Sequence, residues 1–316
     1  MQDLPVQQLH NFEINYHDGQ ARNLALGGVH TSPKDYAKAS LARHLATIAV
    51  SETHQGWQRK EKRMDLQLGG MRALVTGGTR GIGRAIVETL LAEGASVSFC
   101  ARNSQEVADT QNAMALEGRK VMGTALDVSD PAGIVAWIAA SAAKLGGIDI
   151  VVNNVSALAI PTSEENWQLS INVDLLGTVR VCTAALPHLL ESPSPAIVNI
   201  SSVSGREVDF AGGPYGTVKS AIIAYTAHLA FAHAGEGLRA NTVSPGNTYF
   251  PGGVWESIES GNPDLFKMAM DLNPTGKMGT PQDTANAVAF LASPAAGRIS
   301  GTNLVVDGAL TRGIQF

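Results

Sequence analysis

The chain has 316 residues, of which 44% are hydrophobic, and its formal net charge is -5. A chain of this length and apolar content can bury a sizeable core as one large or two small globular domains. The only basic cluster in the sequence, residues 59–63, is interrupted by Glu61, so there is no strong positive field for a polyanion. Nucleic acid is therefore not an expected partner.

The two cysteines and the apolar pattern bear on the compartment. Cys100 and Cys182 have neither the spacing of a metal site nor that of a disulfide framework, so we interpret them as small buried hydrophobic residues and expect no bound metal. No uninterrupted apolar run approaches the roughly 18 to 20 residues that span a bilayer, and the N-terminus lacks a signal-peptide layout. These observations predict a cytoplasmic protein without a membrane span.

Residues 1–63 differ from the rest of the chain. They are rich in His, Gln and Asn, and the one amphipathic helix that they predict begins at Ser32-Pro33 and carries Leu41, Leu45 and Ile48 on one face. We treat them as an N-terminal extension whose role is open: a mis-called translation start, a disordered tail or a docking arm. A single folded domain is expected over residues 64–316.

From residue 71 onward, short β-branched runs alternate with longer helical patterns. Helical runs are followed by Gly94, Gly118, Gly146 and Gly235, where a left-handed residue usually ends a helix. Strands joined by helical crossovers form a parallel sheet covered on both faces. The pattern predicts an α/β fold with a doubly wound, seven-stranded parallel sheet of the Rossmann type. The predicted strands are residues 72–76, 96–100, 121–126, 148–153, 196–201, 239–243 and 303–307.

A glycine-rich turn follows the first predicted strand. Thr76-Gly-Gly-Thr-Arg-Gly-Ile-Gly83 leads from that strand into a helical pattern. Glycines allow a tight turn and a close backbone approach to a phosphate, and the helix presents free N–H groups and the positive end of its dipole. The spacing Gly-x-x-x-Gly-x-Gly differs from the more familiar dinucleotide pattern. Its strand-turn-helix context nevertheless favours a pyrophosphate site over an incidental glycine-rich turn.

The end of the second predicted strand indicates which dinucleotide binds. In doubly wound folds this position carries an acid for a ribose 2′-hydroxyl or an arginine for a 2′-phosphate. Here the strand ends Phe99-Cys-Ala-Arg-Asn103, without a carboxylate, and Arg102 can bind a phosphate bidentately. Arg80 in the glycine turn adds a second cation. We predict NADP(H) over NAD(H); the alternative is that both arginines are solvated surface charges.

Tyr215 and Lys219 lie four residues apart in a predicted helix and therefore project from the same face. An ammonium beside a phenol stabilises the phenolate, which makes the phenol a usable acid or base. Tyr-x-x-x-Lys also occurs by chance, so the pair alone is a weak signal. Its position downstream of the glycine turn is what indicates a functional role. Together the two motifs indicate hydride transfer to or from a bound dinucleotide.

With these elements in this order, the segment from about Met64 to the C-terminus resembles the single-domain branch of the short-chain dehydrogenase/reductase family, and within it the 3-oxoacyl reductases. Asn153-Asn154-Val155 is similar to the family's Asn-Asn-Ala element, and Ser244-Pro245-Gly246 to the Pro-Gly beside the nicotinamide. Asp127 looks like the adenine-contacting acid, and Ser202, thirteen residues before Tyr215, like the catalytic serine. The motifs and the resemblance together predict cofactor contacts from Gly77, Thr79, Arg80, Gly81, Ile82, Gly83, Arg102, Asp127, Asn153, Tyr215, Lys219, Pro245, Gly246 and Thr248.

The resemblance also implies catalytic roles. Tyr215 would donate a proton to a substrate carbonyl as hydride arrives from the nicotinamide, Ser202 would orient the carbonyl oxygen, and Lys219 would bind the nicotinamide ribose and tune Tyr215. The family's fourth-helix Asn corresponds to Asp174 and not to the near miss Asn172, because positions two apart on a helix point away from each other. An ionised Asp174 can accept from water or Lys219 but cannot donate. The alternative is that it only caps or pairs with a basic neighbour.

Three smaller features depart from the family's pattern. Ser156 follows the Asn-Asn element where the family usually has Gly, and Thr248 stands where an aliphatic residue is common. The sequence Asp307-Gly308-Ala309 ends in Ala where many family members have Gly. Each departure weakens the transfer of the family's contacts to that position.

Residues 247–275 correspond to the variable loop that covers the substrate in the family. The loop suits a lipophilic or acyl-linked carbonyl, from which it would exclude water; equally, its apolar residues could pack as core or as a subunit contact. Those apolar residues are Tyr249, Phe250, Val254, Trp255, Leu265, Phe266, Met268 and Met270.

The predicted function is therefore an NADP-dependent oxidoreductase that reduces a ketone or a 3-oxoacyl carbonyl. The alternatives are an alcohol or steroid dehydrogenase working in the oxidative direction and a non-catalytic NADP-binding regulator. A homo-oligomer, as a tetramer or dimer, is implied by the resemblance alone.

Overall fold

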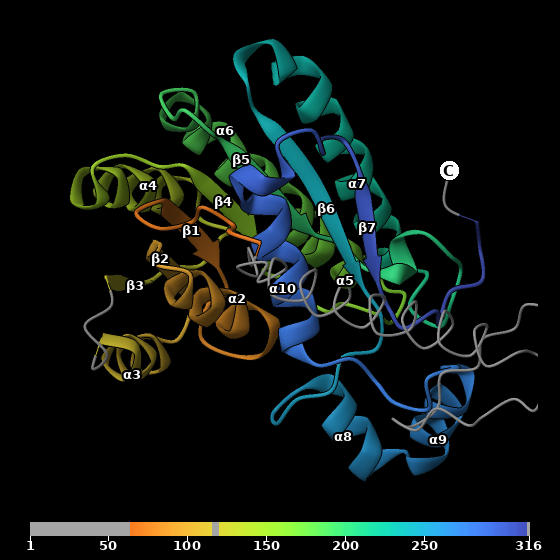
Figure 1. Cartoon of the computed structure of the whole chain (residues 1–316). Coiled ribbons are helices and arrows are strands. Elements are labelled where there is room, and N and C mark those ends of the chain that lie inside the picture. The colour runs from red at the N-terminus through yellow and green to blue at the C-terminus, as the bar shows by residue number, and fades with distance from the viewer. Residues whose placement is uncertain (1–63, 116–119, 315–316) are drawn as a thin grey trace, which may run out of the picture. The chain divides into compact units, whose positions relative to one another are not determined.

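A computed structural model of the chain describes residues 64–115 and 120–314. The N-terminal extension and Gly118 lie outside the described residues. Seven strands form one parallel sheet in the order β3-β2-β1-β4-β5-β6-β7 (Figure 1). The order reverses between β1 and β4, so the predicted doubly wound, Rossmann-like sheet is confirmed. The strands are β1 Arg72–Thr76, β2 Ser96–Ala101, β3 Val121–Ala125, β4 Ile150–Asn153, β5 Ala196–Ile200, β6 Arg239–Pro245 and β7 Asn303–Val306.

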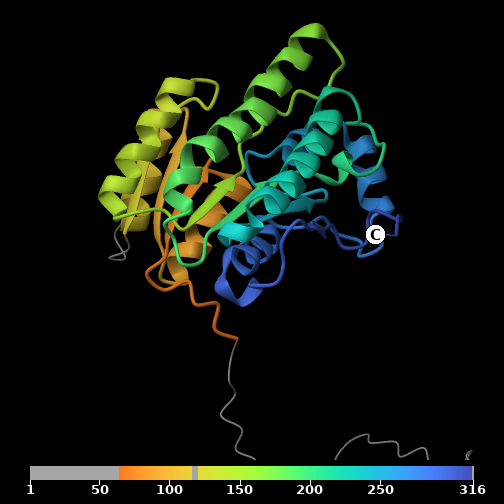
Figure 2. The same ribbon diagram turned by 90° about the horizontal axis from the view of Figure 1, so that it is seen from above.

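Helices cover both faces of the sheet (Figure 2). One apolar core joins the sheet to α2, α3 and α10, and a second core on the opposite face joins it to α4, α6 and α7. The central strands β1, β4, β5 and β6 are buried almost throughout, which explains their continuous apolar runs. The helices are α2 Gly81–Ala92, α3 Ser104–Ala115, α4 Pro131–Leu145, α5 Glu164–Leu169, α6 Leu176–Leu189, α7 Pro214–His233, α8 Val254–Gly261, α9 Pro263–Leu272 and α10 Pro281–Ala292.

Helix ends follow the predicted glycine chemistry with one exception. Gly94 (φ 86°) and Gly146 (φ 81°) take the left-handed conformation just beyond α2 and α4. Gly235 lies inside a 3-10 turn, Ala234–Glu236, and Gly237 (φ 83°) ends that turn. The prediction for Gly235 was wrong because α7 tightens into a last 3-10 turn before the chain leaves it.

One described helical stretch has the length and hydropathy of a membrane span, which the sequence analysis did not anticipate. α5, the π-helix η1 (Ser170–Leu175) and α6 form a continuous helix over Glu164–Leu189 whose 18-residue window has a mean hydropathy of 1.4. The search for uninterrupted apolar runs missed it because polar residues are scattered along it. The stretch packs against α4 and α7 and carries the buried Asp174. Of that window, 39% is buried inside the fold.

Arg239 joins β6 to the end of α10. Its buried guanidinium donates hydrogen bonds to the carbonyl oxygens of Leu291 (2.6 Å), Ala292 (3.2 Å) and Ser293 (3.0 Å). These carbonyls belong to the last turn of a helix and its flanking residue, where intrahelical donors run out. The side chain thus acts as a C-terminal cap that the distant sheet supplies.

Replacing Arg239 with Met is expected to lower the free energy of unfolding by about 3 kcal/mol, because several buried carbonyls lose their donors at once. Chemical denaturation measures the change. The matched control is Arg298→Met, at an exposed arginine, which should change stability by less than about 0.5 kcal/mol. Equal denaturation midpoints for the two variants would show that the cap contributes nothing.

Candidate functional site

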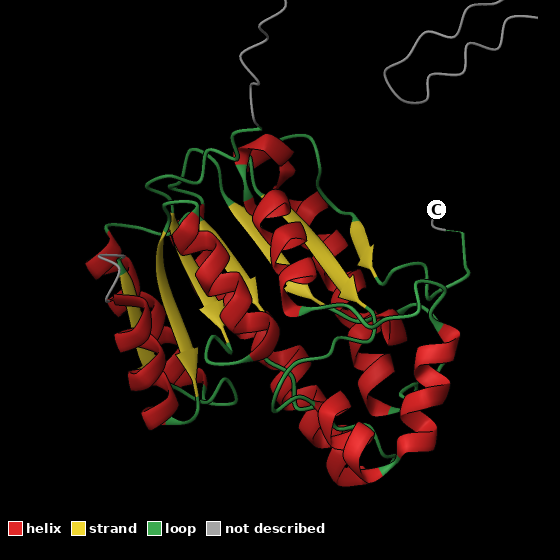
Figure 3. Cartoon of the chain, turned by 60° about the horizontal axis from the view of Figure 1, so that its bottom comes forward, coloured by secondary structure: helices red, strands yellow, loops and turns green. Residues whose placement is uncertain are grey.

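A cavity of about 800 Å³ opens at the carboxyl edge of the sheet. Figure 3 shows the strand arrowheads ending along this edge, and α8 and α9 lie beyond it in Figure 1. The cavity wall is made by the glycine turn, the ends of β2 and β5, the segment after β4, the start of α7 and the loop after β6. It is located where the strand order reverses, the usual place for a ligand in an open parallel sheet.

The glycine turn is shaped to receive a phosphate. Gly77 (φ 71°) and Gly81 (φ 53°) take left-handed conformations that favour glycine. A Cβ atom on Gly83 would lie 2.0 Å from the Gly77 carbonyl oxygen, so this helix start accommodates no side chain. Among the described residues, no side chain caps the first turn of α2 and that turn contains no acid. Its N–H groups are therefore left for an anionic ligand.

Asn154 braces the glycine turn, which the sequence analysis missed. Its backbone N–H donates to Thr76 Oγ1 (2.9 Å), and its side-chain amide donates to the Gly77 carbonyl (3.2 Å). Asn153, the predicted cofactor contact, is instead buried beneath the cavity and donates to Asn199 Oδ1 (2.8 Å). Neighbours in an extended segment point to opposite sides, and that alternation was the available signal for choosing between the two asparagines.

Both predicted cations line the far end of the cavity. Arg80 and Arg102 are exposed there, beside Asp127. The pKa of Asp127 is lowered, chiefly by the hydrogen bond that it accepts from the Ser129 N–H and in part by the charge of Arg102. The strand end itself carries no carboxylate, as predicted, but Glu106 from the first turn of α3 lines the same wall and accepts from Thr79 Oγ1 (3.1 Å). Two acids therefore share this end with the two arginines.

Phe250 reaches the glycine turn from the loop after β6. Its ring lies against Gly81, so closely that a Cβ on that glycine would fall 2.5 Å from Phe250 Cζ. Gly81 is covered in this way, whereas Gly77, Thr79, Ile82 and Gly83 line the cavity. Pro245, Gly246 and Thr248, the other predicted contacts on this loop, also line it.

Three of the four predicted catalytic groups line the same cavity as the glycine turn. Tyr215 and Lys219 come from the first two turns of α7, and Ser202 follows the end of β5. The Lys219 ammonium lies 5.5 Å from the centre of the Tyr215 ring and donates to the Ile200 carbonyl (3.2 Å). Ser202 Oγ accepts from the Ser204 N–H (3.2 Å), which leaves its own proton for another acceptor.

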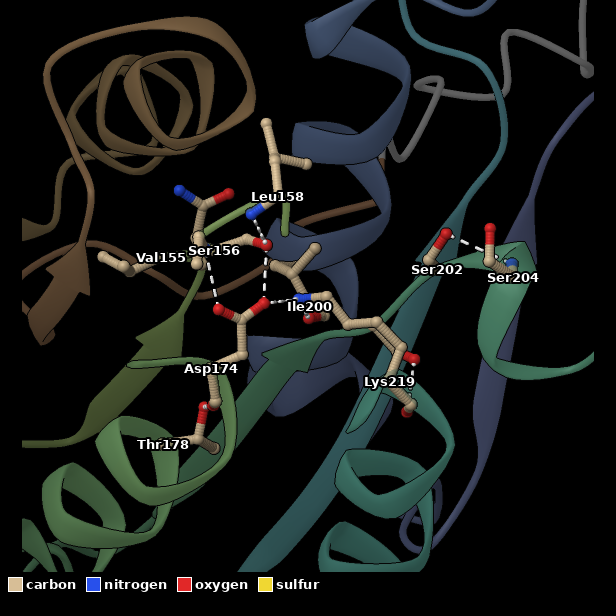
Figure 4. A network of polar contacts seen from close by, with 12 residues as sticks. Val155, Ser156, Leu158, Asp174, Thr178, Ile200, Ser202, Ser204 and Lys219 are labelled. Atoms are coloured by element: carbon tan, nitrogen blue, oxygen red, sulfur yellow. Dashed lines mark hydrogen bonds and ion pairs between the residues drawn. The ribbon is translucent and has the colours of Figure 1, made fainter. Parts of the chain in front are cut away.

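Asp174 lies behind Lys219 and not on the cavity surface (Figure 4). It sits in the π-helix η1, is 1% exposed, and its Oδ2 lies 3.5 Å from the Lys219 ammonium. Asn172 bonds in a different direction, with its side-chain oxygen accepting from Arg180 (3.0 Å). The structure thus brings Asp174, and not the near miss Asn172, to the lysine.

The segment after β6 forms the apolar wall of the cavity. Phe250, Val254 and Trp255 line the cavity, whereas Tyr249, Phe266 and Met270 pack with Trp255 in a small cluster of their own. Both interpretations of the loop therefore apply to part of it. The sequence analysis missed the facing wall, which comes from Leu158, Leu169 and Phe210; the Phe210 and Trp255 rings meet edge to face at 6.0 Å.

The two cysteines lie away from the site. Cys100 in β2 and Cys182 in α6 are buried, and burial raises the pKa of each thiol to about 12. Such thiols are inert packing residues. In the part of the chain that the structure describes, no group of three His, Cys, Asp or Glu side chains is arranged to hold a metal ion.

A phosphate-shaped turn and a Tyr, Lys and Ser group in one cavity of a doubly wound sheet are typical of oxidoreductases that use a dinucleotide. Residues 77–311 match the family model described as enoyl-(acyl carrier protein) reductase. The chain belongs to the short-chain dehydrogenase/reductase family.

Curated relatives match almost over their full length. Isoepoxydon dehydrogenase of Penicillium expansum is 38% identical over 256 residues, which cover 79% of this chain and 98% of the relative. The 3-oxoacyl-(acyl-carrier-protein) reductase of Vibrio cholerae is 32% identical over 249 residues, covering 78% and 99%. Among solved structures, L-sorbose reductase from Gluconobacter frateurii, complexed with NADPH and L-sorbose, superposes with a TM-score of 0.74 at 25% identity, covering 79% of this chain and all of that one.

Proposed function

We propose that this chain is an NADPH-dependent oxidoreductase that reduces a ketone or a 3-oxoacyl carbonyl, with Tyr215 as the proton donor. The observation that carries the proposal is the convergence of Tyr215, Lys219 and Ser202 in the cavity that also contains the glycine turn. Family membership supports oxidoreductase chemistry at a C=O or CH–OH group.

Each of these residues has a distinct task. When bound, the reduced nicotinamide supplies the hydride. The Tyr215 hydroxyl donates the proton to the carbonyl oxygen, and the Ser202 hydroxyl holds that oxygen in line. The Lys219 ammonium, close to the Tyr215 ring, favours the phenolate that remains and binds the ribose. Proton donation by a positioned side chain typically accelerates a reaction by about 10²- to 10⁴-fold. Asp174 acts at one remove, through Lys219.

The cofactor preference rests on Arg80 and Arg102, which line the end of the cavity that suits an adenosine 2′-phosphate. The NADPH complex of the L-sorbose reductase neighbour supports the same choice. Asp127 lies beside Arg102, and Glu106 partly offsets the positive charge. We therefore expect selectivity for NADPH to be set by the balance of these four charges.

Replacing Arg102 with Asp is expected to weaken NADPH binding by about tenfold or more, because a charge-assisted contact is lost and a like charge is added. NADH binding should be much less affected. Nicotinamide fluorescence titrations with both cofactors measure the change. Glu106→Gln is the comparison variant with the opposite expected effect, because it removes a negative charge and should tighten NADPH binding. Unchanged NADPH affinity in the Arg102 variant would count against this assignment.

Two alternatives are carried by specific observations. The dehydrogenase name of the Penicillium relative favours the oxidative direction, in which Tyr215 would accept the proton from an alcohol. A non-catalytic NADP-binding regulator is the other alternative. The convergence of all three catalytic side chains in the cavity argues against it, whereas the replacement of the family's Asn by Asp174 argues mildly for it.

The test is a screen of the purified chain with NADPH against acyl-thioester, aromatic and steroid ketones. The corresponding alcohols are tested with NADP⁺ in the reverse direction. Fluorescence of bound NADPH reports binding, and its loss reports reduction. Consumption with one ketone class supports the reductase and names its substrate. Binding without consumption in either direction would favour the regulator.

In the remaining parts of the proposal, the assembly rests on the family resemblance, the substrate class on the apolar residues of the loop after β6, and the compartment on the sequence pattern. We propose a homo-oligomer, as a tetramer or dimer, that acts on a small lipophilic or acyl-linked substrate in the cytoplasm. Sedimentation of the purified chain tests the assembly, and fractionation of the source cells tests the compartment.

A further inference from the structure

Two departures from the family's pattern contact each other. Ser156 stands where the family usually has Gly, and its hydroxyl donates a 2.6 Å hydrogen bond to Oδ2 of Asp174, which stands where the family has Asn (Figure 4). The Ala157 N–H donates to Oδ1 of the same carboxylate (2.6 Å). Ser156 Oγ in turn accepts from the Leu158 N–H (3.1 Å). A glycine at 156 could make no side-chain bond, so this hydrogen bond requires the serine.

The same carboxylate oxygen faces Lys219. The ammonium lies 3.5 Å from Asp174 Oδ2, which is longer than the roughly 2.7 to 2.9 Å of a direct charge-assisted hydrogen bond. Both carboxylate oxygens already accept short hydrogen bonds, one of them from Ser156. Since the side chains of Lys219 and Asp174 are 3% and 1% exposed, their charges interact strongly even at this separation.

We propose that Ser156 and Asp174 form one positioning couple for Lys219, an inference that rests on the proposed function of the site. Asp174 supplies the buried counter-charge. The hydrogen bond from Ser156 keeps the carboxylate from forming a direct hydrogen bond with the ammonium. The N–H groups of Lys219 therefore stay available for the cofactor ribose, and its charge continues to act on Tyr215. The couple thereby sets how strongly the lysine cation favours the Tyr215 phenolate.

The sign of the effect follows from the surrounding charges. Among the described residues, the titratable groups beside the Lys219 ammonium are Asp174 on η1 and Tyr215, through its ring, on α7. From β5 the ammonium meets the Ile200 carbonyl, whereas the Ser201 hydroxyl donates to the Lys219 backbone carbonyl (2.8 Å). Asp209, at the rim of the same cavity, is bonded to Ser204 and Ala211. Removing the charge of Asp174 leaves the ammonium uncompensated, which favours the phenolate. Removing the Ser156 hydroxyl lets the carboxylate approach the ammonium, and the phenolate of Tyr215 is then disfavoured.

The experiment is a pH titration of the substrate-free chain that follows the ultraviolet absorbance of phenolate. Each variant is also made with Tyr215→Phe, and the titration curve of that version is subtracted so that only the signal of Tyr215 remains. Asp174→Asn should move the appearance of the Tyr215 phenolate to lower pH by about one unit. Ser156→Ala should move it in the opposite direction. In the double variant the effect of Ser156→Ala should vanish, because Ser156 acts only through the carboxylate. The control is Asp149→Asn, which disrupts the ion pair with Arg72 outside the cavity and should shift nothing.

Each outcome decides the proposal. The proposal is overturned if the Tyr215 titration is unshifted in Asp174→Asn, or if it shifts in the same direction in both single variants. It is also overturned if the two shifts add in the double variant. If Asp174→Asn fails to fold, Ser156→Ala alone still decides, since an unshifted titration there contradicts the couple. The titration needs no substrate, so failure of the carbonyl screen would overturn the proposed reductase activity and leave this result independent.

Discussion

Tyr215→Phe is expected to lower the rate of carbonyl reduction by about 10²- to 10⁴-fold, because the proton donor is removed. The aromatic ring stays, and with it the packing beside the Lys219 ammonium, so NADPH binding should be retained. Single-turnover oxidation of NADPH with the best ketone of the screen measures the rate, and nicotinamide fluorescence measures binding.

The matched control for this variant is Tyr225→Phe. Tyr225 lies on the same helix, but its hydroxyl is in hydrogen-bonding contact with Thr183 and Cys182, away from the cavity, and burial raises its pKa. This variant should turn over at close to the wild-type rate. Substantial activity in Tyr215→Phe, or an equal loss in both variants, would refute the role of Tyr215 as the proton donor.

Gly83→Ala is expected to weaken NADPH binding by about 10²-fold or more. The new Cβ would lie 2.0 Å from the Gly77 carbonyl oxygen and 2.4 Å from the Asn154 side-chain nitrogen. The turn would therefore have to open by more than an ångström, a displacement that typically costs about two orders of magnitude at a precise site. Fluorescence titration with NADPH measures the affinity, and circular dichroism reports whether the domain still folds.

Gly235→Ala provides the comparison for that change. No described atom lies within 4 Å of a Cβ at this position, and the backbone needs no glycine there. The stability of the Gly235→Ala variant should be unchanged or slightly raised, and it should bind NADPH as the wild type does. If Gly83→Ala also bound NADPH normally, the glycine turn would not be the pyrophosphate site.

The strands could be predicted from the sequence because burial on both faces imposes a simple pattern on them. β1 lies where it was expected, and β2 and β6 extend one and two residues further. The one late start is β4, which begins at Ile150 instead of 148. Glycines correctly marked the ends of α2 and α4, but α7 continues into a 3-10 turn that contains the predicted Gly235.

The parts of the site that could not be predicted depend on side-chain direction. Glu106 is one helical turn beyond the strand end that was searched for acids, and only the packing of α3 brings it to Thr79. Sequence spacing did favour Asp174 over Asn172, but the contact of Asp174 with Ser156 joins a π-helix to a loop 18 residues away, and helix spacing gives no such partner. Phe250 reaches Gly81 across the cavity, and no local pattern encodes such a contact.

The segment around Trp255 has a small apolar cluster separate from the two cores of the sheet. The frame that holds Ser202, Tyr215 and Lys219 belongs instead to β5 and α7. New ligand preferences could thus be acquired by exchanging side chains in the segment alone, without loosening the scaffold beneath. Such a division makes this cavity a suitable starting point for directed evolution toward bulkier ligands.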